Sequence, residues 1–196
     1  YMKDNKDHCF DGYSFHTYDG SYNDLREFIK ERVDYAAPKP VYLTEFGFRK
    51  EEDSSWAAGY ANSIIGGANY GLGGMAVWQF NGVWCEDPDE EILTNGDYTL
   101  CDALYTDIYP KNSYYQVSML ERYIPAHSTV ISATTEASDV RAAAFKTSEG
   151  DYTIVVECDS GVAKSLTLDF GGAEIGKTFG KHIYTHNAIK EGNALI

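Results

Sequence analysis

The run Val41-Tyr-Leu-Thr-Glu-Phe-Gly-Phe48 constrains the fold of this chain more than any other segment. It is almost continuously apolar and rich in β-branched and aromatic residues, which is typical of a strand buried on both faces in a parallel sheet. One acid, Glu45, interrupts the run near its end, just before Gly47. A carboxylate in such a strand is costly unless it is paired or used. In a barrel of parallel strands, this end of the strand is where catalytic groups stand.

Strands and helices alternate over the first 124 residues. The expected elements are strands at 13–18, 41–48 and 75–80 and helices at 24–35, 56–69 and 113–123. A strand–helix repeat of this kind predicts parallel strands joined by crossover connections. The pair Gly66-Gly67 permits the second helix to pack closely on the sheet. Residues 81–111 are expected to form a long polar loop.

The pattern changes after Pro125, where short apolar runs are separated by turns without an intervening helix. Such spacing indicates antiparallel structure. The expected strands are 129–135, 141–147, 152–158, 165–170 and 177–185. We therefore divide the chain into an α/β unit, residues 1–124, and a β-sandwich, residues 125–196. Three parallel strands make an incomplete layer and the chain begins with Tyr1, so we expect both units to be parts of something larger.

Composition excludes several kinds of partner. The 196 residues include 16 basic and 30 acidic ones, and a net charge of −14 argues against nucleic acid and anionic membranes. No apolar segment approaches the roughly 20 residues of a membrane span. The 16 Tyr and 9 Phe suit a surface that stacks on ring-shaped ligands, although barrels and sandwiches are aromatic-rich in any case. The four cysteines form no CxxC, and spacing leaves open whether Cys85 and Cys101 are bridged.

Three expected strands end in side chains that are unusual for a sheet core. They are His16 and Tyr18 on the first strand, Glu45 on the second, and Trp78, Gln79 and Asn81 on the third. Because parallel strands end at one rim, we expect these groups to converge. An indole offers a face to the C–H side of a sugar ring, while polar groups bind hydroxyls and hold the acid in place. The set therefore suits a carbohydrate.

These strands resemble part of the clan A glycoside hydrolases, the (β/α)8 barrels that include the family 5 cellulases and mannanases. The matching segments are His16-x-Tyr18, Thr44-Glu45-Phe46-Gly47 and Val77-Trp78-Gln79-Phe80, in the order of the sixth, seventh and eighth strands. The helix at 113–123 looks like the eighth helix. The resemblance implies an α/β fold: the carboxyl-terminal part, strands 6–8, of a TIM barrel, followed by an antiparallel β-sandwich domain.

The resemblance also implies roles for individual residues. Glu45 maps onto the catalytic nucleophile of a retaining glycosidase, Tyr18 onto the tyrosine that hydrogen-bonds it, and His16 onto a histidine that lines the site. Trp78 maps onto the floor under the reacting sugar. Retaining glycosidases use two carboxyl groups about 5–5.5 Å apart, one to attack the anomeric carbon and one to protonate the leaving oxygen.

Further substrate contacts are expected beside Trp78. Gln79 follows it on the third strand and Asn81 comes directly after that strand, while Trp84 lies in the following loop, where it either stacks on a further sugar or covers the barrel. No cofactor and no metal are expected. The loop Glu86-Asp-Pro-Asp-Glu-Glu91 is dense enough in carboxylates to bind calcium, although a solvated acidic loop is the simpler interpretation.

The sequence departs from the family pattern at the acid/base residue. That glutamate follows an Asn in the family, and this chain has no Asn-Glu pair. The family's early-strand Arg also has no counterpart. The resemblance therefore implies that the acid/base lies in a missing N-terminal half of the barrel, which becomes an expected partner. The other expected partner is an oligosaccharide or polysaccharide with β-linkages, hydrolysed by a secreted, extracellular bacterial enzyme.

Two other interpretations stay open. A non-catalytic barrel that binds carbohydrate would carry the same aromatic surfaces without a functional acid/base. A free-standing small α/β protein would use Glu45 as a structural acid paired with Arg26 or Arg49, and would close an apolar surface around its three strands. A barrel fragment, in contrast, would leave exposed strand edges.

Overall fold

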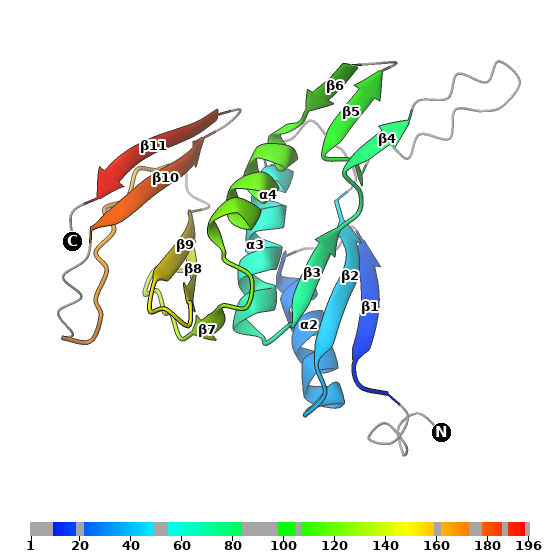
Figure 1. The fold of residues 1–196 in the computed structure, drawn as a ribbon, viewed down its shortest axis with the longest axis horizontal. Helices are drawn as coiled ribbons and strands as arrows, with labels where there is room; N and C mark the ends of the chain where they lie inside the picture. Colours follow the sequence, from blue (N-terminus) through cyan, green and yellow to red (C-terminus); the bar gives the residue numbers. More distant parts are fainter. Residues whose placement is uncertain are drawn as a thin grey trace, which may run out of the picture.

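The computed structural model describes residues 10–18, 22–48, 55–83, 98–104, 107–158, 162–172, 178–185 and 188–194. Figure 1 shows their arrangement. In chain order the elements are β1 (Tyr13–Tyr18), α2 (Tyr22–Ala36), β2 (Val41–Gly47), α3 (Ser55–Asn69), β3 (Gly74–Val77), β4 (Asn81–Val83), β5 (Cys101–Leu104), β6 (Asp107–Pro110), α4 (Asn112–Tyr123), β7 (Thr129–Ile131), β8 (Val140–Lys146), β9 (Tyr152–Cys158), β10 (Phe179–Thr185) and β11 (Ala188–Ala194).

The first three strands form a parallel sheet in the order β1-β2-β3. Helix α2 connects β1 to β2, and α3 connects β2 to β3. The prediction of parallel strands with helical crossovers is therefore confirmed. Since β2 is the central strand, the strand that carries Glu45 is the one held by hydrogen bonds on both sides.

The main hydrophobic core lies between this sheet and the helices. Ile29 of α2 and Leu43 of β2 are both 0% exposed, and Phe46 of β2 is 1% exposed. Tyr60 of α3 and Val117 of α4 pack into the same cluster. Full burial of side chains of this size contributes about 1.5–3 kcal/mol each. The face of β2 that packs against the helices is thus firmly buried. It supports the side chains on the opposite face of the strand.

Close packing of α3 on the sheet depends on Gly67. A Cβ placed there would lie 2.4 Å from the Met75 sulfur of β3 and 3.1 Å from Leu72. Because real Cβ atoms do not approach that closely, a larger residue would force the flexible Met75 side chain to move, whereas glycine allows this packing without that shift. The expectation that the glycine pair serves close packing is confirmed at this position.

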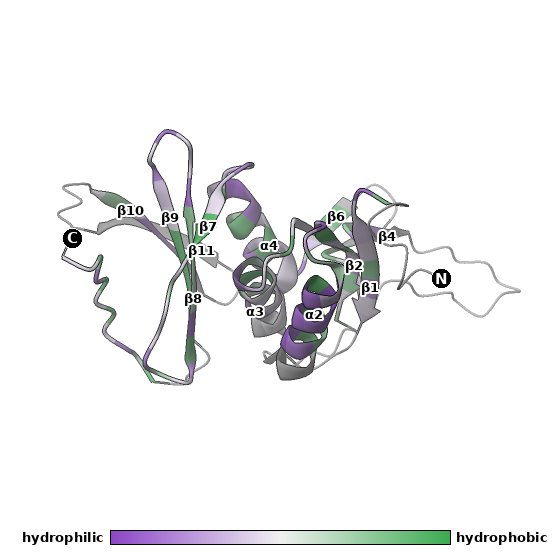
Figure 2. Cartoon of the chain, turned by 90° about the horizontal axis from the view of Figure 1, so that it is seen from below, coloured by the Kyte–Doolittle hydropathy of each residue, from purple (hydrophilic) through white to green (hydrophobic). Residues whose placement is uncertain are grey.

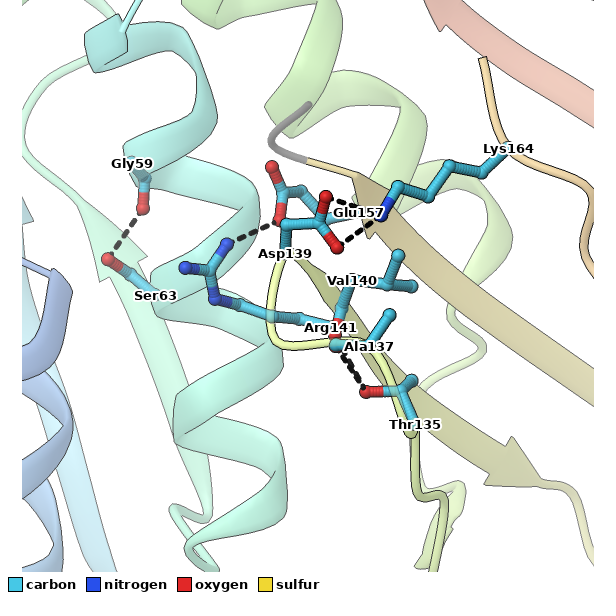
Figure 3. Close-up of polar contacts among 9 residues, drawn as sticks. All are labelled: Gly59, Ser63, Thr135, Ala137, Asp139, Val140, Arg141, Glu157 and Lys164. Atoms are coloured by element: carbon cyan, nitrogen blue, oxygen red, sulfur yellow. Dashed lines mark hydrogen bonds and ion pairs between the residues drawn. The ribbon is translucent and has the colours of Figure 1, made fainter. Parts of the chain in front are cut away.

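The second part of the chain is antiparallel. Strands β7, β8 and β9 form one sheet and β10 and β11 form a hairpin. Arg141 on β8 and Glu157 on β9 are cross-strand partners whose charged groups lie 2.9 Å apart, and Asp139 forms an ion pair with Lys164 (Figure 3). Antiparallel strands after Pro125 are confirmed, whereas their assembly into a sandwich stays a prediction.

Helices α3 and α4 lie between the parallel sheet and the antiparallel strands (Figure 2). Ile65 of α3 packs against Ala143 and Phe145 of β8 in a second, smaller core. Two hydrogen bonds cross the same boundary. The Asn69 side chain donates to the carbonyl of Ala142 at 2.9 Å, and the Thr153 hydroxyl donates to that of Tyr123 at 2.6 Å.

Four predictions of local structure need correction. The expected loop 81–111 contains β4, β5 and β6, and the strand expected at 75–80 ends at Val77. Residues 165–170 form no strand, and Leu166 among them is 56% exposed, so this segment does not show the burial of one face that an alternating strand requires. The strand expected at 129–135 ends at Ile131, because the chain then turns away into the loop before β8.

Candidate active site

One face of the parallel sheet is open. Alternate residues along the strands point away from the core and are exposed, among them Tyr18 at 37%, Tyr42 at 41% and Trp78 at 39%. Other residues of the same strands, such as Phe15 of β1 and Met75 of β3, pack against the core instead. Parallel sheets are normally covered on both faces, so an open face of this kind is unusual. It is the face on which the candidate residues gather.

A one-residue register shift turns Glu45 toward this open face. Leu43 pairs with Phe15 of β1, but Glu45, two residues later, pairs with His16. The pairing with β3 shifts at the same place, between Leu43 and Phe46. In a regular strand Glu45 would share the core side with Leu43, because residues two apart face the same way. The extra residue, Thr44, reverses that alternation, as bulges near active sites commonly do.

The register shift brings Glu45 into contact with His16 and Tyr18. The Tyr18 hydroxyl donates a hydrogen bond to Glu45 Oε2, and His16 Nδ1 lies 3.2 Å from the same oxygen. The Glu45 side chain is 28% exposed. Within the described part of the chain, both contacts fall on Oε2 and none on Oε1. One carboxylate oxygen is therefore held while the other is left to meet a ligand.

The electrostatics of Tyr18 keep it a donor. Partial burial of the phenol, its hydrogen bond to Glu45 and the negative charge of that carboxylate raise the pKa of Tyr18 above its usual value of 10.0. The phenol therefore stays protonated at neutral pH. A protonated phenol beside a carboxylate donates to it, so the hydrogen bond holds one oxygen of Glu45 in place.

Trp78 stands at the end of β3 and is locked to β2 through its backbone. Its N–H donates to the Phe46 carbonyl at 2.8 Å, and its peptide bond to Gln79 is cis. Its own carbonyl oxygen lies 2.6 Å from the position that a Cβ on Gly47 would take. Glycine at position 47 thus allows the Trp78 backbone to close over the end of β2. The exposed indole extends from the same face as Tyr18.

For Gln79 and Asn81, the other predicted binding residues, the structure gives contacts of the main chain only. Gln79 donates through its backbone N–H to the Tyr98 carbonyl at 3.0 Å, and Asn81 pairs with Cys101 at the start of β4. These are contacts of the main chain, and the substrate roles of both side chains stay predictions. Trp84, Cys85 and the acidic loop 86–91 lie outside the described residues.

Sequence reasoning missed Tyr98. Its ring packs edge-on against that of Tyr18, with centroids 5.1 Å apart and an interplanar angle of 71°. Tyr98 belongs to the segment that we expected to be a polar loop, so no periodicity marked it as part of the site. Only the backbone pairing between residues 79 and 98 brings it there.

The structural interpretation of Glu45 fits the contacts less well. Arg26, one of its two suggested partners, donates to the Tyr70 hydroxyl at 2.7 Å; the other, Arg49, lies outside the described residues. A free-standing protein was also expected to close an apolar surface around its strands. Instead β1 and β3 are open edges of the described sheet, and its face exposes Tyr42, besides Tyr18 and Trp78.

Among the described residues, no cluster of three or more His, Cys, Asp or Glu side chains is arranged to hold a metal ion. Within the same residues, no helix has the length and apolar character needed to cross a membrane.

The chain is similar to part of SrfJ from Salmonella typhimurium, with a TM-score of 0.59 at 15% identity, over 94% of this chain and 38% of that one. It thus shares the fold of a portion of SrfJ and spans well under half of its length. It also aligns with the catalytic domain of the GH30 xylanase C from Talaromyces cellulolyticus, with a TM-score of 0.49 at 18% identity, over 61% of this chain and 28% of that one.

A third alignment is with the endo-β-1,4-mannanase from Thermotoga petrophila, with a TM-score of 0.40 at 15% identity, over 92% of this chain and 37% of that one. Both of these enzymes are glycoside hydrolases by name, but TM-scores below 0.5 carry no weight for this chain. No protein-family model matches the sequence, and a search of curated proteins finds no match.

Proposed function

We propose that this chain supplies the nucleophile half of a retaining glycoside hydrolase active site, with Glu45 as the nucleophile. The observation that carries the proposal is the pair of contacts on one oxygen of Glu45, from Tyr18 and His16, at the open face of a parallel sheet. A nucleophilic carboxylate must be ionised, oriented and reachable. The hydrogen bond from Tyr18 supports orientation of the carboxylate, and the partial exposure of Glu45 supports access to it.

The reaction would proceed by double displacement. Glu45 Oε1 attacks the anomeric carbon of a β-linked sugar and the glycosidic C–O bond breaks, while a carboxylic acid protonates the leaving oxygen. Water then attacks the anomeric carbon of the glycosyl ester, gives its proton to the same carboxyl group and releases Glu45. In this proposal the acid/base residue is not among these 196 residues, and strands that complete the barrel bring it to the site.

The division of the chain follows the same proposal. Residues 1–124 would be the carboxyl-terminal part of a (β/α)8 catalytic barrel and residues 125–196 a β-sandwich domain of a secreted enzyme. Tyr18 and the exposed indole of Trp78 would face the substrate together with Gln79, Asn81 and Trp84. Aromatic faces of this kind suit the C–H surface of a pyranose.

Kinetics of the full-length protein test the role of Glu45. Glu45→Gln should lower turnover of an aryl β-glycoside by on the order of 10³-fold or more while leaving substrate affinity nearly unchanged, because the amide keeps the shape but cannot form the ester. Glu27→Gln, which neutralises an exposed carboxylate on α2, is the matched control and should retain full activity. Sodium azide should restore turnover to Glu45→Ala by replacing the missing nucleophile.

The competing function is carbohydrate binding without hydrolysis, which the exposed aromatic side chains of the open face also fit. It predicts that Glu45→Gln changes nothing beyond affinity and that the full-length protein does not turn over any aryl glycoside. Detectable turnover that survives Glu45→Gln unchanged would contradict the nucleophile proposal directly.

A further inference from the structure

The backbone of Tyr98 is fixed beside the end of β3. Gln79 donates its N–H to the Tyr98 carbonyl at 3.0 Å, and Leu100 donates back to the Gln79 carbonyl at 2.9 Å. The pairing continues one step further, where Cys101 donates to the Phe80 carbonyl at 2.8 Å. Residues 98–101 therefore run alongside residues 79–80 as a short ladder. This ladder places the Tyr98 side chain at the carboxyl end of the parallel sheet.

The ring of Tyr98 fills the space above Gly47 and beside Tyr18. A Cβ on Gly47 would lie 3.1 Å from Tyr98 Cδ1, so this ring packs directly on the backbone of β2. Its edge-on contact with Tyr18, at 5.1 Å and 71°, is the arrangement that aromatic pairs favour. Such pairs contribute about 0.5–1.5 kcal/mol beyond the area they bury.

Tyr18 needs a neighbour of this kind. It stands on β1, at the edge of the sheet that the structure describes, and Tyr18 is 37% exposed. Among the described residues, Tyr98 supplies the ring contact that Tyr18 makes. A phenol that leaves this position can no longer donate to Glu45. The orientation of the carboxylate thus depends, through Tyr18, on the ring of Tyr98.

We propose that Tyr98 is a positioning residue of the candidate active site: its ring holds Tyr18 so that the Tyr18 hydroxyl stays on Glu45 Oε2 and leaves Oε1 toward the substrate. The catalytic consequence rests on the function proposed above, whereas the placement of Tyr18 does not. The two parts are therefore tested by separate measurements.

The first test is a titration that needs no activity. The phenolate absorbance of Tyr18 is isolated as the difference between the wild-type protein and Tyr18→Phe, and again as the difference between Tyr98→Leu and the double variant Tyr98→Leu/Tyr18→Phe. Loss of the Tyr98 ring exposes Tyr18 to water and loosens its bond to Glu45, so Tyr18 should ionise at lower pH in the second pair. Ionisation at the same pH in both pairs would overturn the proposal.

The second test measures labelling of the full-length protein by 2,4-dinitrophenyl 2-deoxy-2-fluoro-β-glycosides of glucose, mannose and xylose. This probe has a leaving group that needs no acid, so its rate reports on the nucleophile alone. Tyr98→Leu should slow labelling on the order of 10- to 100-fold, as expected for a misplaced reacting group. Tyr98→Phe keeps the ring and should label at nearly the wild-type rate.

A double-mutant cycle separates positioning from general damage. If Tyr98 acts through Tyr18, then Tyr98→Leu should slow labelling much less in a Tyr18→Phe background than in the wild type. If Tyr98→Leu slows labelling by the same factor in both backgrounds, the two residues act independently, and the proposal is contradicted. Tyr115→Leu is the matched control, because it removes one ring of another edge-on pair, with Tyr114 at 5.4 Å, outside the site.

The outcomes distinguish the two proposals. A wild-type protein that none of the probes labels refutes the glycosidase function, and the titration still decides the role of Tyr98. Normal labelling of Tyr98→Leu refutes the positioning role and leaves the function intact. If Tyr98→Leu does not fold, Tyr98→Met, which also lacks the ring, replaces it in the same two measurements with the same expected results.

Discussion

The two parts of this molecule bury their strands differently. In the parallel part, residues of helices α2, α3 and α4 pack on one face of β1-β2-β3 and leave Leu43 and Phe46 almost fully buried, while the opposite face stays open and carries the polar groups. In the antiparallel part, burial is shallower: the small core around Ala143 and Phe145 depends on Ile65 of α3. The described core of the antiparallel part is therefore built jointly by β8 and helix α3.

That difference shows why the candidate site sits where it does. A reacting carboxylate needs a rigid strand behind it and open space in front of it. Strand β2 offers both, because it is central in the sheet and is packed on one face only. Strand β9, with intermediate burial along most of its length, offers neither a deep core nor an open polar face.

The largest expected contrast is in core stability. Phe46→Ala should lower the free energy of unfolding by about 3–5 kcal/mol, because it empties a fully buried aromatic site. Val156→Ala on β9, which removes a side chain that is 37% exposed, should cost about 1 kcal/mol or less. Chemical denaturation measures both. Equal losses of unfolding free energy in the two variants would mean that the two parts are equally well packed, which would contradict the difference described above.

A smaller effect is expected at the end of β2. Gly47→Ala should destabilise the protein by roughly 1–3 kcal/mol and disturb the site, because the new methyl group meets the Trp78 carbonyl and the Tyr98 ring. Gly74→Ala is the control from the same sheet. There the nearest atom, on Tyr42, is 3.4 Å away, so the change in unfolding free energy should stay within about 0.5 kcal/mol. If denaturation curves show that Gly74→Ala destabilises the protein more than Gly47→Ala does, the close approach of the Trp78 backbone to Gly47 is contradicted.

The attachment of the tail should be sensitive to single hydrogen bonds. Asn69→Ala and Thr153→Val each remove one bond across the boundary and should cost about 1 kcal/mol. Hydrogen exchange should show the loss of protection mainly at amides of β8 and β9, and less at β2. Ser128→Ala, which removes a bond within the local turn to Pro125, should leave both regions unchanged. Equal loss of protection in β2 would show that the two parts unfold as one unit.

The smallest effect concerns pH. Because the pKa of Tyr18 is raised on folding, the folded state binds that proton more tightly than the unfolded state. The stabilisation is therefore fully present below pH 10.0, the usual value, and is lost only as pH rises through the higher folded value. The difference in stability between the wild type and Tyr18→Phe should stay constant from neutral pH to about 10 and shrink above it. A stability difference between the two proteins that already shrinks between pH 7 and pH 9 would contradict the hydrogen bond from Tyr18 to Glu45.

Long apolar patterns made much of this structure predictable. The run at 41–48 became the central strand β2, and the periodic segments at 56–69 and 113–123 became α3 and α4 with nearly the expected bounds. In contrast, β5 and β6 have four residues each; β5 includes Asp102, and β6 begins at Asp107 and ends at Pro110. Such short, polar strands have too little periodicity to be recognised.

The site was only partly predictable, for a physical reason. The sequence indicated that His16, Tyr18 and Glu45 share a strand end, but strict alternation would have placed Glu45 on the core side with Leu43. The register shift at Thr44 that corrects this depends on pairing with both neighbouring strands. Tyr98 was missed because its position depends on a backbone ladder between segments some twenty residues apart.

The most direct test of the account is to find where an activated sugar becomes attached. The full-length protein is incubated with a 2,4-dinitrophenyl 2-deoxy-2-fluoro-β-glycoside, digested and analysed by mass spectrometry. If Glu45 is the nucleophile, one fluoroglycosyl group will be found on the peptide that contains Glu45 and none on the Glu45→Gln variant. Release of dinitrophenol with the sugar attached to a different carboxylate, and Glu45 unmodified, would contradict it.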